Sequence, residues 1–260
     1  MDTTPRTAGG GPVTLDGTTP ATDKALGTGT PTPADVAVRV KGTLEGVFGA
    51  VAATREDTGA LLASVTAAGR RPTTADLAAL RPALHTRLRR FDLASGMGFI
   101  AAPGLLADVP AWLEWWQIST DGEVNRLLLD LDPEHSAYSD YTHWDWYALA
   151  RDTGRRAVAG PYVDYLCSDE YSLTLSVPVA VGGHFAGVAA ADVYLPHFEA
   201  AVLPLMRRLP DPAVLVNARG RIAVSTDARH LAGSLLKGHD LRPVPGDIPL
   251  ALVTTGHTPD

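Results

Sequence analysis

The segment from Tyr138 to Asp192 combines aromatic rings and carboxylates at close spacing. Its members are Tyr138, Tyr141, Trp144, Trp146, Tyr147, Tyr162 and Tyr165, together with Asp140, Asp145, Asp164 and Asp192. Aromatic faces are electron-rich, and each contact with a cation contributes about 0.5 to 2 kcal/mol. Carboxylates add charge-assisted hydrogen bonds to an ammonium group. The segment therefore predicts a binding site for an ammonium ligand.

The same region has weaker candidates for catalysis or metal binding. His143 lies two residues before Asp145, but residues at i and i+2 of a helix face apart, and no Ser lies in a GxSxG turn. The acidic run Leu129–His135 lacks the glycine and the oxygen spacing of a calcium loop. A single cysteine, Cys167, excludes an internal disulfide and a thiolate zinc site. We therefore expect no enzyme, no catalytic residue, no metal and no cofactor.

Composition and charge restrict the partners of the chain. The net charge is −7, whereas direct binding of nucleic acid needs a basic patch. An apolar fraction of 45% over 260 residues is enough for a sizeable core. No secretory leader is legible, and no apolar run reaches the length of a membrane span. We therefore expect a cytoplasmic protein that contacts neither nucleic acid nor membrane.

The elements that position these residues begin with helices. Residues 1–33 are rich in Thr, Pro, Gly and Ala and predict a disordered tail. Apolar residues at helical spacing predict a long helix from Ala34 to Val65. A second helix is expected from Thr74 to Arg90, with a kink or a break at Pro82. These helices form an N-terminal helical region over residues 34–91.

Short apolar runs then predict a sheet within residues 92–209. Strands are expected at Gly96–Ala101 and Leu113–Ser119 and an extended segment at Val124–Leu131, then a short helix over Asp140–Ala150. The clearest hairpin is formed by two apolar runs around a Gly-Gly turn, as expected for central strands covered on both faces. Its two strands are Tyr171–Val181 and Phe185–Tyr194.

The C-terminal part adds smaller elements. A helix is expected at Pro196–Leu209, and a second hairpin is expected from Ala213–Asn217 and Arg221–Ser225. Residues 210–260 thus form an additional hairpin, or part of a second module, and a proline-rich tail. The element order predicts an α+β fold: an antiparallel sheet with helices packed to one side, a long N-terminal helix and a helical insert.

These features resemble the Cache family of PAS-like ligand sensors, in particular the double Cache sensors of amino acids and amines. Three of them carry the resemblance: the long leading helix before short strands, the pair Trp146-Tyr147 followed by a turn at Gly160-Pro161-Tyr162, and a hairpin whose second strand ends in Asp192. The run Val214–Asp227 is similar to the start of a second Cache module. The resemblance implies a ligand sensor, in a family of membrane receptors.

The resemblance also implies roles for individual residues. In amino-acid-binding members, an Arg two residues before the Trp-Tyr pair holds the ligand carboxylate, and a Tyr and an Asp hold its ammonium. The matching positions here are Trp146, Tyr147, Tyr162 and Asp192. The Arg position is Trp144, and a neutral indole cannot clamp a carboxylate. Asp164 adds a carboxylate instead, so the expected ligand shifts from a zwitterion towards an amine.

The predicted ligand-binding residues comprise aromatic walls and acidic anchors. They are Trp144, Trp146, Tyr147, Tyr162, Asp164, Asp192, Tyr138 and Trp115, with Trp116 as the alternative to Trp115. Ordinary roles stay open at each: helix-to-sheet packing for the rings, and capping of a backbone amide for the acids.

We expect a cytoplasmic, non-enzymatic sensor of an amine, a quaternary ammonium or an amino-acid-like molecule. Ligand binding would shift the helical insert against the leading helix. A transcriptional regulator or other signalling protein would read that change, or a homodimer would act alone. The alternative is a ligand-free dimerisation or interaction module of the same fold. The sequence identifies neither the ligand nor the partner nor the oligomeric state.

Overall fold

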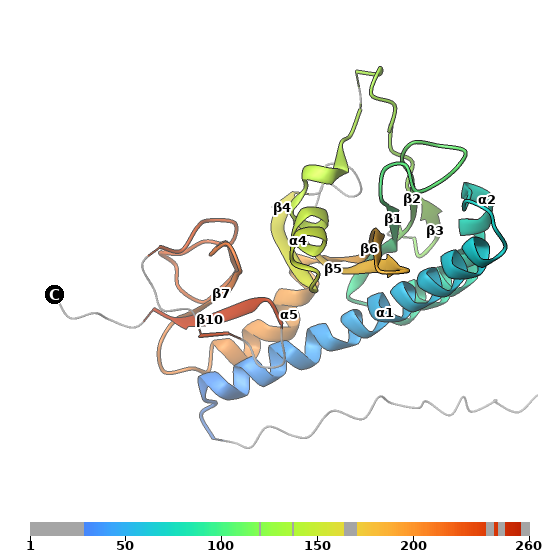
Figure 1. Ribbon diagram of the computed structural model, residues 1–260. Helices are drawn as coiled ribbons and strands as arrows, with labels where there is room; N and C mark the ends of the chain where they lie inside the picture. The colour runs from blue at the N-terminus through green and yellow to red at the C-terminus, as the bar shows by residue number, and fades with distance from the viewer. Residues whose placement is uncertain are drawn as a thin grey trace, which may run out of the picture.

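The computed structural model describes residues 29–119, 121–136, 138–163, 171–237, 242–243 and 248–255. In this part of the chain, two antiparallel sheets lie along one long helix, α1 (Pro33–Ala67), as Figure 1 shows. The first sheet lies near the C-terminal half of α1, and the second lies near its N-terminal end. Most of the predicted disordered tail, residues 1–28, lies outside the described residues, and the helix begins at Pro33.

Helix α1 begins and packs as its sequence predicts. Thr32 and Asp35 form a capping box, in which each side chain accepts a hydrogen bond from the other residue's backbone N–H, and Pro33 occupies the first turn. The apolar residues recur every three or four positions, so they form one buried stripe. The stripe comprises Val36, Val40, Leu44, Val47, Val51, Leu62 and Val65.

The second predicted helix is divided at the expected place. It consists of α2 (Thr74–Leu77), the short 3₁₀ helix η1 (Ala78–Leu80) and α3 (Arg81–Arg90). Pro82 lies in the first turn of α3, where its missing N–H has no intrahelical acceptor to lose. The predicted break at Pro82 is therefore confirmed.

The first sheet has the strand order β3-β2-β1-β6-β5-β4. Its strands are β1 (Ala94–Ala101), β2 (Leu113–Ile118), β3 (Val124–Arg126), β4 (Ala157–Val163), β5 (Tyr171–Val181) and β6 (His184–Tyr194). The predicted hairpin, β5–β6, is central. The expected turn at Gly160-Pro161-Tyr162 is wrong, because these residues lie within β4. Pro161 fits there since β4 is an edge strand with a bulge between Ala159 and Tyr162.

Helices cover both faces of the first sheet. Helix α4 (Asp145–Thr153), which follows the 3₁₀ helix η2 (Tyr141–His143), lies on the side of β5 and β6 opposite α1 (Figure 1). Along β6, Ala189 and Ala191 belong to the core that contains α1, whereas Val188 and Ala190 pack with Trp146 of α4. The prediction that helices pack to one side is therefore wrong for α4, because its buried aromatic rings need the apolar face that α1 leaves uncovered.

The second sheet has the order β8-β7-β10-β9 and follows α5 (Leu195–Met206). Its strands are β7 (Ala213–Asn217), β8 (Ile222–Ser225), β9 (Arg242–Pro243) and β10 (Leu250–Thr254). The predicted β7–β8 hairpin is confirmed. The predicted C-terminal tail is wrong in part, because the apolar run at β10 pairs with β7 along its whole length. Its proline-rich flanks concealed that strand.

Candidate functional site

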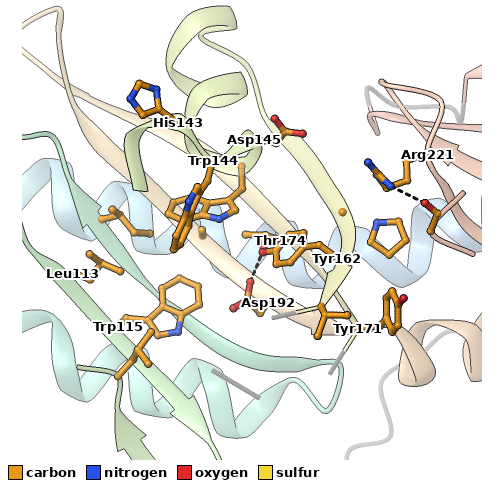
Figure 2. A pocket seen from close by; sticks show the side chains of 18 of the residues that line it. Leu113, Trp115, His143, Trp144, Asp145, Tyr162, Tyr171, Thr174, Asp192 and Arg221 are labelled. Atoms are coloured by element: carbon orange, nitrogen blue, oxygen red, sulfur yellow. Dashed lines mark hydrogen bonds between the residues drawn. The ribbon is translucent and has the colours of Figure 1, made fainter. Parts of the chain in front are cut away.

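A cavity of about 700 Å³ lies on the α4 face of the first sheet. This volume is within the range of small-molecule binding sites, roughly 300 to 1,000 Å³. Its walls come from β1, β2, β4, β5, β6, the loop after β3, the start of α4 and part of the second sheet (Figure 2). Five predicted site residues line it together: Trp115, Trp144, Trp146, Tyr162 and Asp192.

Asp192 is held in the cavity by a relay of hydroxyl groups. Its side chain is buried, and Asp192 and Thr174 are direct partners in the β5–β6 ladder, so their side chains share a face. The hydroxyl of Thr174 donates to Oδ1 of Asp192 over 2.6 Å, and the hydroxyl of Tyr162 bonds to Oγ1 of Thr174. A threonine has one hydroxyl proton, so Tyr162 must be the donor to Thr174. The relay orients the carboxylate within the cavity.

Two indoles at the start of α4 form an aromatic corner of the cavity. The ring centroids of Trp144 and Trp146 lie 5.6 Å apart at an interplanar angle of 71°, an edge-to-face contact. The backbone carbonyl of Trp146 accepts a hydrogen bond of 2.7 Å from Ser176 of β5, which fixes the start of the helix over the sheet. The corner presents aromatic faces and edges to the cavity that Asp192 also lines.

Trp115 forms another wall, and Gly96 makes room for it. A Cβ atom at Gly96 would lie only 2.9 Å from Nε1 of Trp115, so the indole occupies the space above this glycine. Gly96 is the direct partner of Asp192 in the β1–β6 ladder. The indole N–H of Trp115 is buried without a hydrogen-bond partner among the described residues, and such donors are costly. The N–H is available to an acceptor on a bound molecule.

Trp116 points to the opposite face of the first sheet. Its indole N–H donates to the fully buried carboxylate of Glu114 over 2.9 Å, and Arg81 pairs with the same carboxylate at 2.8 Å. Successive strand residues face opposite sides, so Trp115 and Trp116 cannot line the same cavity. Trp116 has a structural role in this ion-paired cluster.

Two predicted site residues, Tyr147 and Tyr138, do not line the cavity. Tyr147 does not line it, because the next residue along a helix points about 100° away from Trp146. Its ring packs against Tyr141 and Phe185, at centroid distances of 5.3 and 5.7 Å, and burial raises the pKa of Tyr147 to about 12. Tyr138 is 41% exposed and does not line the cavity either. Asp164 lies outside the described residues.

Other lining residues were not predicted. Thr174 had a readable signal, since Ser172, Thr174 and Ser176 alternate with apolar residues and so mark one polar stripe on β5. Arg221 comes from the second sheet and had none. Asp145 also lines the cavity and pairs with Arg219 at 2.8 Å. In the part of the chain that the structure describes, no group of three or more His, Cys, Asp or Glu side chains is arranged to hold a metal ion.

Comparison with known proteins identifies this architecture. Residues 119–200 match the family model described as methyl-accepting chemotaxis protein-like, first PDC sensor domain. A curated relative, the methyl-accepting chemotaxis protein PscA of Pseudomonas syringae pv. tomato, is 27% identical over 123 residues, which are 46% of this chain and 19% of that protein. The chain thus spans about a fifth of the length of this relative.

Solved structures show the same fold over most of the chain. Methyl-accepting chemotaxis protein X superposes with a TM-score of 0.54 at 19% identity, covering 81% of this chain and 78% of that one. The ligand-binding domain of the Pseudomonas aeruginosa PAO1 amino acid chemoreceptor PctC has a TM-score of 0.51 at 22% identity, covering 84% and 92%. The chain has a Cache-type fold. The fold that the resemblance implies is therefore confirmed.

Within this Cache-type fold, the cavity differs from the amino-acid pattern at one charged position. Trp144 lines the cavity where the resemblance implies an arginine in amino-acid-binding members. Of the described residues that line the cavity, Arg221 is the one arginine or lysine. Separately, no helix in the described ranges is long and apolar enough to cross a membrane.

Proposed function

We propose that this Cache-type fold senses a small molecule with an ammonium group, without catalysis. The molecule is an amine, a quaternary ammonium or an amino-acid-like compound. The observation that carries the proposal is the carboxylate of Asp192, buried in a cavity whose other walls include Trp115, Trp144 and Trp146. A carboxylate in a low-dielectric site favours a cationic guest. The structure of the similar PctC domain was solved with GABA, which bears such a group.

The aromatic rings and the carboxylate act on different parts of the ammonium group. Asp192 accepts its N–H groups as charge-assisted hydrogen bonds. The indole faces attract the positive charge without consuming a donor, so they also suit a quaternary ammonium. Because Tyr162 and Thr174 orient Asp192 before any ligand arrives, little further ordering is needed on binding. A neutral or anionic compound would lack this charge-assisted pairing with Asp192.

The binding signal reaches α1 through β4 in this proposal. Helices α4 and α1 lie on opposite faces of the sheet (Figure 1), so the insert does not shift directly against the leading helix. Strand β4 contributes Tyr162 to the cavity, and Arg156 immediately precedes this strand. Arg156 forms a bidentate pair with Glu45 of α1, both contacts at 3.1 Å. A change in the position of β4 is thereby coupled to α1.

Calorimetry with a panel of primary, quaternary and amino-acid amines tests the proposal. Asp192→Asn preserves shape but removes the negative charge, so the affinity for the tightest amine is expected to fall by at least about tenfold. Asp57→Asn is the matched control, because this acid pairs with Arg87 and does not line the cavity. Equal amine affinity in wild type and Asp192→Asn contradicts the proposal.

A thermal-shift screen separates the sensor from a ligand-free interaction module. A ligand at one hundred times its dissociation constant adds about 2.7 kcal/mol to stability. No shift with any amine favours the dimerisation module. The cytoplasmic location, the signalling partner (including a transcriptional regulator) and the homodimer stay predictions.

A further inference from the structure

The second sheet supplies part of the cavity wall. Arg221 precedes β8, and Ala232 and Gly233 follow it, yet all three line the cavity on the α4 face of the first sheet. Figure 2 shows Arg221 extending from the second sheet towards β4, with Asp192 at a distance from it over the first sheet. The cavity therefore brings together one acid from the first sheet and one guanidinium from the second.

Asn217 fixes the turn that presents Arg221. Oδ1 of this buried side chain accepts the backbone N–H groups of Arg219 and Arg221 over 2.9 and 3.0 Å. Its Nδ2 donates to the carbonyl of Gly160 over 2.6 Å, and Gly160 is itself a cavity wall on β4. One side chain thus shapes the β7–β8 turn and attaches it to the rim of the cavity. The backbone position of Arg221 is therefore fixed by hydrogen bonds within the fold.

The guanidinium of Arg221 retains donors for a ligand. Its Nη1 donates to the carbonyl of Gly233 over 2.6 Å, which uses one of five N–H donors. Among the described residues, no carboxylate forms an ion pair with Arg221. The nearby acid Asp145 is paired with Arg219 instead, at 2.8 Å. The guanidinium of Arg221 is therefore a positive charge at the cavity wall that is held in place by a neutral carbonyl group.

We propose that Arg221 binds an anionic group of the ligand, an inference that rests on the proposed function of Asp192 as the ammonium anchor. The ligand is then an elongated zwitterion whose ammonium and carboxylate lie at separate ends. In a plain α-amino acid both charged groups are attached to one carbon, whereas Asp192 lies on the first sheet and Arg221 comes from the second, apart from it in Figure 2. An ω-amino acid fits this arrangement, and a cavity of about 700 Å³ has room for its chain.

Matched probes test this assignment on the full chain. The n-alkylamines from butylamine to heptylamine are compared by calorimetry with ω-amino acids of the same chain length, which differ by the added carboxylate. In the wild type, the ω-amino acid of the best length is expected to bind about tenfold tighter than its amine, as one bidentate guanidinium–carboxylate contact provides. Arg221→Gln loses this gain and keeps the affinity for the alkylamine. Arg221→Lys keeps part of the gain.

Arg207→Gln is the control for charge, because Arg207 is exposed at the end of α5 and does not line the cavity. It should behave as the wild type, and the thermal unfolding of Arg221→Gln without ligand should match the wild type because this side chain is exposed. Amine binding with no gain from the carboxylate, or a gain that survives Arg221→Gln, overturns the assignment of Arg221 alone. Absence of binding by every probe overturns the ammonium site with it.

Discussion

The hydroxyl of Thr174 donates to Oδ1 of Asp192 over 2.6 Å, across the two central strands of the first sheet. The pair is fixed by backbone register, since the two residues are direct antiparallel partners. The carboxylate is therefore oriented by the sheet itself, and Tyr162 extends the arrangement to the edge strand β4. Ligand affinity should depend on Thr174 even though a methyl group there would fill the same space.

Thr174→Val should lower the affinity for amines by about tenfold, because the carboxylate loses a charge-assisted hydrogen bond and its fixed orientation. Calorimetry with the tightest amine measures the change. Thr58→Val is the matched control, since Thr58 is also fully buried but its hydroxyl, among the described residues, donates to the carbonyl of Thr54 within α1 and not to a cavity residue. If both variants lower the affinity equally, the relay to Asp192 has no role in binding.

Gly96→Ala should weaken ligand binding and also lower the stability of the fold. The three atoms nearest to the added Cβ all belong to the indole of Trp115, with Nε1 at 2.9 Å, so the ring must move. Overpacking of this kind costs about 1 to 3 kcal/mol, and we expect amine affinity to fall about tenfold. Calorimetry and urea unfolding measure the two effects.

Gly98→Ala is the comparison for Gly96→Ala, because its Cβ would lie 2.2 Å from the backbone carbonyl of Glu114, which cannot rotate away. This variant should lose far more stability. A Gly96→Ala protein that binds amines like the wild type would show that the position of Trp115 is unimportant for the ligand.

Arg156→Gln should leave ligand binding intact but remove the effect of ligand binding on α1. The substitution removes the bidentate pair with Glu45 and leaves every described cavity-lining residue in place. In the wild type, amine binding should slow amide hydrogen exchange near Glu45. In Arg156→Gln this slowing should be lost, while the affinity for amines should be unchanged. Arg55→Gln is the control, because Arg55 pairs with the exposed Glu56 on the same helix. If amine binding still slowed amide hydrogen exchange near Glu45 in Arg156→Gln, the cavity would be coupled to α1 through other residues.

Stability in acid should depend on Asp227, which follows β8. Arg229 donates to this buried carboxylate over 2.8 Å and Thr255 over 2.6 Å. These hydrogen bonds, that of Arg229 foremost, hold the pKa of the Asp227 carboxyl well below its usual range. A lowered folded pKa stabilises the protein above the unfolded pKa, about 3.9, and this contribution is lost as pH falls below it towards the folded pKa.

Asp227→Asn should therefore lower the free energy of unfolding at neutral pH, and the difference from the wild type should shrink below about pH 4. Urea unfolding over a pH series measures it. A difference that is constant across the series would mean that the ionised carboxylate contributes nothing beyond its shape.

Local spacing was enough to predict most elements of the first sheet and the helices around it. The helix from Ala34 follows from a periodicity of 3.6 residues, and the hairpin at Tyr171–Tyr194 follows from two apolar runs around a Gly-Gly turn. Both signals are properties of neighbouring positions. The strand at Ala157–Val163 was missed because Gly160-Pro161 indicates a turn, and a proline in a strand needs an edge and a bulge that only pairing reveals. The strand at Leu250–Thr254 was concealed in the same way by the prolines around it.

The sequence by itself determined the chemistry of this protein: a segment rich in indoles, phenols and carboxylates suited to an ammonium group, with no basic patch. Only the tertiary structure decided which of these groups meet. Strand register put Asp192 beside Thr174 and Trp115 over Gly96, helix geometry turned Tyr147 into the core, and the second sheet brought Arg221 to the cavity. Side-chain type is local, whereas convergence depends on contacts between residues far apart in the chain.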